Sequence, residues 1–136
     1  MGTKNVRKIF HAAEILDKTT FDQIQKMKAD DRTEQFAQTI YEGLAKKKIY
    51  ITNLAKCTQA YARPLKDNVF KDYLAFTLEE IAILQPKHII TFGNQVSSIL
   101  LEKPIKVSEY TDTEHEQITI KGKSYNVYPT RYPVGQ

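Results

Sequence analysis

Polar and reactive side chains gather at the end of one β-prone stretch. Residues 48–54 are nearly all apolar or β-branched, and Asn53, Lys56 and Cys57 stand at the end of this stretch or just after it. The side-chain amide of asparagine offers an acceptor and two donors, so it can pair with the edge of an amide or a nucleobase. Asn53 is therefore a candidate base-reading residue. The alternative is that Asn53 caps the loop after a strand, which is a common use of asparagine.

A carboxylate follows a second stretch of this kind. Glu14 comes after residues 7–13, which we expect to form the first strand. Ligands of open α/β sheets bind beyond the carboxyl ends of the strands, where a carboxylate can orient or activate a water molecule. A helix competes with the strand over this segment, because Ala12 and Leu16 favour helices. In that case Glu14 is an exposed helical residue.

The cysteine and histidine residues do not form a metal-binding pattern. The chain has one cysteine, which cannot form an internal disulfide, and three histidines. His11, His88 and His115 lack the spacing of metal ligands. We therefore predict no metal site and no cofactor. Cys57 has no activating histidine nearby in the sequence, so we expect a partly buried small side chain rather than a nucleophile.

Helices are expected where apolar residues recur at intervals of three and four. Two of them begin at residues 17–20, where Asp17 and Thr20 are among the capping residues, and after Thr33, and two others cover residues 69–84 and 94–101. Together with the strands, these helices give the order β-α-β-α-β-α. This order predicts an α/β fold with a mainly parallel open sheet.

Strands are expected where apolar and β-branched residues run together. The runs at residues 48–54 and 88–92 suggest burial on both faces, as in a parallel sheet covered by helices. Residues 118–120 and 124–128 flank a Lys-Gly-Lys turn and predict a hairpin whose second arm is the last central strand. No helix is expected after it, so we expect a chain shortened at its C-terminus.

The composition fits one compact domain covering residues 1–136. The chain is 41% hydrophobic and 26% charged, and its net charge of +4 with a pI of about 9.1 permits an anionic partner such as nucleic acid. The N-terminus lacks the apolar region of a signal peptide, and no apolar run approaches the roughly 18 residues that a membrane span needs. We expect a cytoplasmic protein that does not bind membranes. The oligomeric state stays open.

The order of the motifs resembles the uracil-DNA glycosylase superfamily, most of all its bacterial and archaeal iron–sulfur branch. The resemblance covers about residues 48–133 and begins with Ile-Tyr-Ile-Thr-Asn-x-x-Lys-Cys at residues 49–57. It continues with Leu-Gln-Pro-Lys-His-Ile-Ile at residues 84–90, a strand ending in Gly93, and Tyr-Pro-Thr-Arg-Tyr-Pro at residues 128–133.

This resemblance implies a three-layer α/β/α fold with a four-stranded, mainly parallel central sheet. It also implies a pocket into which a base is flipped from uracil-containing single- or double-stranded DNA. Asn53 matches the uracil-reading asparagine of the family, and Glu14 matches the acidic residue that helps to activate water. Lys56, Arg63, Lys66 and Arg131 flank the implied pocket and are candidates for contacts with DNA phosphates.

The chain departs from the family pattern at three places. The first family motif is Gly-Glu-x-Pro-Gly, whereas Glu14 here lies in Ala-Glu-Ile-Leu-Asp at residues 13–17. The family's terminal His-Pro is replaced by Tyr132-Pro133, although a tyrosine hydroxyl can still donate to the leaving group. Cys57 matches one cluster ligand and Tyr73 occupies another, so an iron–sulfur cluster is not expected.

Two functions follow from this mixture of matches and departures. The first is a DNA repair glycosylase that hydrolyses the N-glycosidic bond of uracil or a related damaged base, with Glu14 and Tyr132 as catalytic residues. The second is a catalytically degraded member that binds DNA, a nucleotide or a protein.

Overall fold

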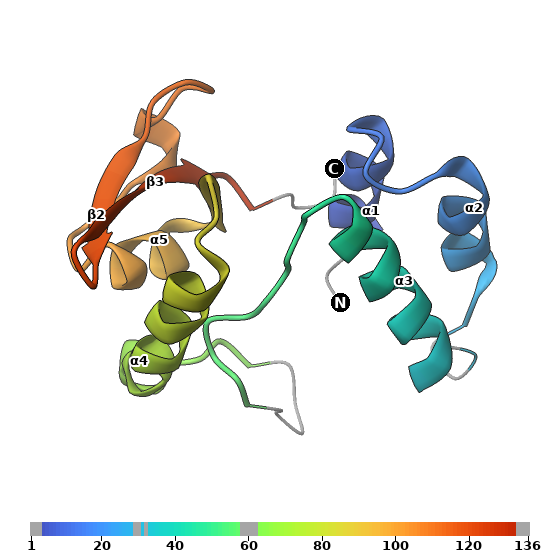
Figure 1. Ribbon diagram of the computed structural model, residues 1–136, viewed down its shortest axis with the longest axis horizontal. Helices are drawn as coiled ribbons and strands as arrows, with labels where there is room; N and C mark the ends of the chain where they lie inside the picture. Colours follow the sequence, from blue (N-terminus) through green and yellow to red (C-terminus); the bar gives the residue numbers. More distant parts are fainter. Residues whose placement is uncertain (1–3, 29–30, 32, 58–62, 133–136) are drawn as a thin grey trace. The chain divides into compact units, whose positions relative to one another are not determined.

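The chain forms two compact units, each with its own hydrophobic core (Figure 1). The computed structural model describes residues 4–28, 31, 33–57 and 63–132. The first unit comprises Met1–Thr52 and Pro133–Gln136, and the second comprises Asn53–Tyr132. The predicted single domain over residues 1–136 stays a prediction. Residues 58–62 and the end of the motif at residues 128–133 lie outside the described residues.

The described part of the first unit is helical, with α1 (Lys4–Ala12), α2 (Lys18–Lys26) and α3 (Glu34–Lys46). Apolar side chains from these helices and from the turn after α1 meet in one core. Its buried members are Phe10, Leu16, Ile24, Ile40 and Leu44. The core explains why three short helices are stable together, because isolated helices of this length are marginal in water.

Side-chain caps begin two of these helices. The Asp17 carboxylate accepts a hydrogen bond from the backbone N–H of Thr20 at 2.9 Å, and the Thr33 hydroxyl accepts one from the N–H of Phe36 at 3.2 Å. Each cap satisfies a donor that has no partner inside the helix. The two helices predicted near Thr20 and Thr33 are confirmed.

The strand predicted at residues 7–13 is wrong, because this segment continues α1 to its C-terminus. The helix ends in a Schellman motif, in which Ile15 N–H donates to the Phe10 carbonyl at 2.8 Å and Glu14 N–H donates to the His11 carbonyl at 3.0 Å. Glu14 adopts the left-handed conformation that this motif requires, with φ at 56°. The β-branched and aromatic residues of this segment therefore serve a helical core face, which is the alternative that Ala12 and Leu16 indicated.

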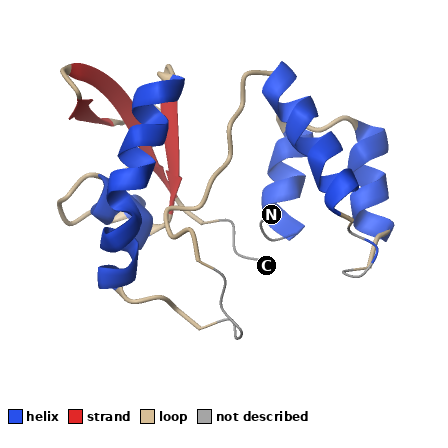
Figure 2. Ribbon diagram, turned by 60° about the horizontal axis from the view of Figure 1, so that its bottom comes forward, coloured by secondary structure: helices blue, strands red, loops and turns tan. Residues whose placement is uncertain are grey.

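The strand predicted at residues 48–54 is also wrong. A second Schellman motif ends α3, with Lys48 at φ 58° and Ile49 N–H donating to the Leu44 carbonyl at 3.0 Å. Residues 49–52 then run outside any strand of the described chain (Figure 2). Ile49 and Ile51 pack on the helical core, whereas Tyr50 is 57% exposed. The apolar run is thus buried on one side against helices and not within a sheet.

The second unit is a mixed α/β structure built on three strands. Helix α4 (Asp67–Leu84) leads to β1 (His88–Phe92) and α5 (Asn94–Leu100). The short 3₁₀ helix η2 (Val107–Glu109) precedes the hairpin of β2 (Glu116–Ile120) and β3 (Lys123–Thr130). The predictions of α4, β1, α5 and the hairpin are confirmed.

The sheet of this unit has the order β1-β3-β2, so the predicted last central strand is central. Strand β3 is parallel to β1 and antiparallel to β2. The predicted four-stranded, mainly parallel sheet is corrected to three strands with one parallel and one antiparallel pair. The predicted β-α-β-α-β-α order is wrong, because residues 7–13 and 48–54 do not form strands.

The two faces of this sheet differ. Val127 in β3 is 0% exposed and packs with residues of α4 and α5, including Ile81 and Leu100. On the other face of β1, His88 is exposed and Ile90 is 60% exposed. The expected burial of β1 on both faces is therefore wrong, and the outward residues of β1 and β3 are available to line a pocket.

Truncating one core residue in each unit tests whether the chain is one domain. We expect Leu44→Ala to lower the unfolding free energy by about 3 kcal/mol and Val127→Ala by about 2 kcal/mol, because each side chain is almost fully buried. Urea denaturation followed by circular dichroism measures both. If the chain is one domain, both variants shift one common transition.

Two transitions, each shifted by one of these variants, would contradict the single-domain prediction. Ile83→Ala is the control, because Ile83 is 78% exposed and its truncation should change the free energy by less than about 0.5 kcal/mol.

Candidate functional site

The carboxyl ends of β1 and β3 meet at Gly93. Its N–H donates to the Thr130 carbonyl at 2.8 Å, and its φ of 90° is a conformation that side-chain-bearing residues rarely adopt. Tyr132 lies beside this junction, with its ring centroid 6.4 Å from that of Phe92 and the two planes at 85°. Tyr132 is 43% exposed at the strand ends.

Two buried hydroxyl groups fix the turn from β1 into α5. The Thr91 and Ser97 hydroxyl oxygens are 2.8 Å apart, and the Ser97 hydroxyl also donates to the Gly93 carbonyl at 2.8 Å. Ser97 is fully buried and Thr91 nearly so. Buried hydroxyl groups need such partners, and the network ties the turn at Gly93 to α5.

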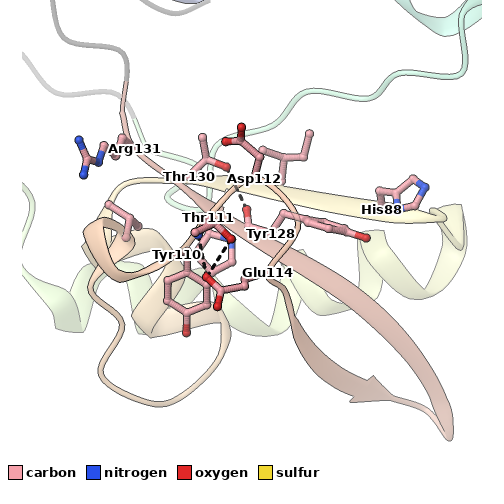
Figure 3. A pocket seen from close by; sticks show the side chains of 11 residues that line it. His88, Tyr110, Thr111, Asp112, Glu114, Tyr128, Thr130 and Arg131 are labelled. Carbon is pink, nitrogen blue, oxygen red and sulfur yellow. Dashed lines mark hydrogen bonds between the residues drawn. The ribbon is translucent and has the colours of Figure 1, made fainter.

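An open pocket of about 660 Å³ lies on the outward face of the sheet (Figure 3). Its walls come from β1, β3 and the segment between η2 and β2. The lining residues are His88, Ile90, Val107, Tyr110, Thr111, Asp112, Glu114, Tyr128, Pro129, Thr130 and Arg131. His88 and Arg131 lie at opposite ends of the pocket, with Tyr128 between them (Figure 3). The pocket thus combines aromatic surface with one guanidinium group and two carboxylates.

Aromatic contacts fix the ring of Tyr128. The His88 ring lies edge-on to it with centroids 5.6 Å apart, and the His115 ring lies 5.2 Å away at 37°. Edge-to-face and offset arrangements of this kind are the favoured ones for aromatic pairs. Tyr128 is therefore a fixed wall of the pocket.

Hydrogen bonds brace the segment between η2 and β2. The Tyr110 hydroxyl donates to the Glu116 carboxylate at 2.6 Å, and Lys103 pairs with the same carboxylate at 2.5 Å. The hydrogen bond to Glu116 raises the pKa of Tyr110 to about 12, and hydrogen bonds from Lys103 and Tyr110 lower the pKa of Glu116. At neutral pH Tyr110 is thus protonated and Glu116 ionised, which suits a structural brace and not a general base.

Glu114 is engaged in a local turn. Its carboxylate accepts hydrogen bonds from the Thr111 N–H at 2.8 Å and from the Thr111 hydroxyl at 3.1 Å. These bonds fix the loop that forms one wall of the pocket. Asp112 is a second exposed carboxylate of the same loop.

Asn53 begins the second unit and lies in a loop that is pinned to α4. Its side chain is exposed, whereas the next two residues, Leu54 and Ala55, are buried. The Lys56 ammonium donates to the Asn53 carbonyl at 2.8 Å and to the Glu80 carboxylate at 2.6 Å. The predicted Asn53 and Lys56 are therefore in direct contact through the backbone of Asn53.

Glu14 belongs to the first unit, where it ends α1. Its side chain is exposed, and its carbonyl accepts a hydrogen bond from the Lys47 ammonium. A carboxylate at a helix C-terminus meets the negative end of the helix dipole, which favours a position in solvent. Glu14 is thus a helix-ending residue and not the strand-ending residue that the sequence predicts.

The predicted phosphate contacts are exposed residues of the second unit. Arg131 follows β3 and lines the pocket, while Arg63 and Lys66 precede α4. Gln95 of α5 anchors the latter segment by donating to the Leu65 carbonyl at 2.9 Å and to the Asp67 carboxylate at 2.8 Å. Of the residues predicted from the sequence, Arg131 and Tyr132 lie together at the end of β3.

Most residues that line the pocket were not predicted from the sequence. His88, Tyr110, Asp112 and Tyr128 line it but were not predicted as site residues. A usable signal was the alternation along β3, where Tyr128 follows the inward-facing Val127. The segment between η2 and β2 carries no comparable periodic signal, because its turns depend on side-chain hydrogen bonds.

Within the described residues, no group of three or more His, Cys, Asp or Glu side chains could hold a metal ion, and Cys57 is exposed. The exposure of Cys57 contradicts the predicted partial burial. The absence of a cofactor stays a prediction.

Among the described helices, none is both long and apolar enough to cross a membrane.

The brace at Glu116 predicts a pH-dependent stability. The folded-state pKa of Glu116 lies below its ordinary value of 4.5, so its contribution is present above that value and is lost as the pH falls through the folded-state pKa. We expect Glu116→Gln to be less stable than the unaltered protein at pH 7, with the difference shrinking toward acid pH. Urea denaturation at a series of pH values measures this difference.

Glu109→Gln provides the control for this experiment, because Glu109 forms an exposed ion pair with Lys106 at 3.6 Å that should contribute little. An unchanged difference between Glu116→Gln and the unaltered protein across the acid range would contradict the assignment.

The sequence model described as Uracil DNA glycosylase superfamily matches residues 6–135. No curated protein and no solved structure matches the chain. The iron–sulfur branch inferred from the motifs stays a prediction.

Proposed function

Because the chain belongs to the uracil-DNA glycosylase superfamily, we propose that it removes uracil or a related damaged base from DNA. The match over residues 6–135 is the observation that carries this proposal, since it includes nearly the whole chain. An enzyme of this kind must take the base out of the stack, because the glycosidic bond is inaccessible inside the duplex. We therefore infer that the chain flips the target nucleotide before cleavage.

Asn53 is the residue that we assign to base reading. Its side-chain amide can donate and accept at once, which suits the edge of uracil. Asn53 is an exposed residue on a loop with buried neighbours, and its carbonyl is anchored by Lys56, which supports this role. A site that hydrogen-bonds its substrate rejects bases whose groups leave those bonds unmade.

The reaction replaces the bond between the sugar carbon and the base nitrogen by a bond to water. The electron pair of the broken bond goes to the departing base, and the water oxygen bonds to the sugar carbon and loses a proton. We assign the orientation or activation of this water to Glu14. The hydroxyl of Tyr132 would donate to the negative charge that develops on the base, in place of the family's histidine.

Cationic residues near the strand ends are assigned to DNA phosphates. Arg131, Arg63 and Lys66 are exposed on the second unit, and the chain carries a net charge of +4. Such contacts give affinity without sequence selectivity. Lys56 was predicted to act in the same way, but its ammonium group is already paired with Glu80.

A second function is a catalytically degraded member that binds DNA, a nucleotide or a protein. Two observations favour it. Tyr132 stands where the family has histidine, and Glu14 forms the left-handed end of a helix with the proline and second glycine of its motif missing. In this case DNA or nucleotide binding would persist without base release.

Substitution of Asn53 separates these functions. Asn53→Ala should lower the rate of uracil release from single- and double-stranded DNA by about 100-fold or more, because the donor and acceptor of the base-reading amide are lost. Asn68→Ala is the matched control, since Asn68 is an exposed asparagine of α4. If the unaltered protein binds the DNA but releases no uracil, the enzyme proposal fails and the binding function stands.

Substitution of Tyr132 tests the proposed leaving-group contact. Tyr132→Phe removes the hydroxyl but keeps the ring against Phe92, so we expect about a 10- to 100-fold fall in the single-turnover rate. Tyr132→His restores a donor of the family type and should retain more activity than Tyr132→Phe. Equal rates for Tyr132→Phe and the unaltered protein would rule out a role of the hydroxyl.

A further inference from the structure

We propose that Lys56 and Glu80 form a clamp that positions Asn53 for base reading, and that Lys56 is not a phosphate contact. This proposal rests on the proposed function for its catalytic consequence, but the clamp itself is a feature of the second unit. The Lys56 ammonium lies 2.6 Å from the Glu80 carboxylate and 2.8 Å from the Asn53 carbonyl oxygen. One ammonium group therefore joins the loop to the C-terminal half of α4.

The segment of residues 53–56 is held at several points. Leu54 and Ala55 are buried between Asn53 and Lys56, so the clamp holds both ends of this four-residue segment and its centre is buried. The bond to the Asn53 carbonyl fixes the plane of the following peptide group. The orientation of the Asn53 α-carbon is restricted with it, while Asn53 is an exposed residue.

Both side chains of this ion pair are partly buried, unlike those of the neighbouring pair on α4. The side chains of Lys56 and Glu80 are 26% and 28% exposed, whereas those of Lys121 and Glu79 are 62% and 57% exposed. A partly buried ion pair is costly to break from one side, because the remaining charge loses its partner. An ammonium held in this way is also a poor candidate for capturing a phosphate, since it would have to leave a carboxylate.

Positioning matters for this reaction because the base must be held in a reactive geometry. Displacements of about 1 Å by mutations away from the chemistry can cost about 100-fold in rate. Loss of the clamp should therefore lower kcat more than it raises KM. The same loss should leave the electrostatic part of DNA binding nearly unchanged.

Two neighbouring glutamates of α4 supply a matched pair of substitutions. Glu80→Gln removes the clamp's carboxylate charge, and Glu79→Gln makes the same change one residue earlier at the exposed pair with Lys121. For a clamp, we expect Lys56→Gln and Glu80→Gln each to lower kcat about tenfold or more, and Glu79→Gln to leave it unchanged. Lys56→Arg, which keeps charge and donors, should recover part of the loss. The double variant of Lys56 and Glu80 should be little worse than either single variant.

Salt dependence distinguishes the clamp from a phosphate contact. If Lys56 contacts phosphate, Lys56→Gln lowers the slope of log K against log salt by about 1, and Glu80→Gln tightens DNA binding by releasing the ammonium. If Lys56 belongs to the clamp, the slope for Lys56→Gln stays that of the unaltered protein. A reduced slope together with tighter binding by Glu80→Gln would overturn the proposal.

Amide hydrogen exchange tests the clamp without any catalytic readout. We expect Lys56→Gln and Glu80→Gln to increase exchange at the backbone amides of residues 54–56 about tenfold, and Glu79→Gln to leave it unchanged. Unchanged exchange in both clamp variants would overturn the proposal. If the unaltered protein releases no uracil but the exchange changes appear, the proposed function fails and the clamp stands.

Discussion

The pairing of β3 with a strand on each side is the constraint on which the second unit depends. β3 is parallel to β1 and antiparallel to β2, so a shift of its register would disturb both ladders at once. The shift would also exchange its two faces, because successive side chains point in opposite directions. Val127 would leave the core and Tyr128 would enter it. The same alternation that builds the core therefore sets the wall of the pocket and the direction in which the chain leaves toward Arg131 and Tyr132.

The sequence was sufficient for the elements whose signals are local. The apolar spacing of α4, the caps at Asp17 and Thr33, and the turn before β3 each depend on a few neighbouring residues. The hairpin turn is a clear example, because Lys121 and Gly122 both have positive φ, as a two-residue turn of type I′ requires. Such features are fixed by short-range chemistry and can be predicted without knowledge of the tertiary contacts.

The two predicted strands that do not form lie beside helix ends that the sequence does not mark with glycine. Both α1 and α3 end in a left-handed residue that is not glycine, namely Glu14 and Lys48, so the usual signal of a helix end is missing. The apolar residues that follow fold back on the helical core, and an apolar run does not show whether helices or strands will cover it. The pocket was hidden for a related reason, since Tyr110 and Glu114 are brought to it by hydrogen bonds that no periodicity reveals.

The second unit begins and ends at residues with proposed functions. Asn53 is its first residue and Tyr132 its last, so the proposed base-reading amide and leaving-group donor flank an uninterrupted stretch of chain. The backbone continues from each of them directly into the other unit, at Thr52 and Pro133. The hairpin turn at Gly122 lies well inside this stretch, where a change in loop length leaves both junctions intact. A change in backbone flexibility at either junction would instead affect Asn53 or Tyr132, although no side chain is altered.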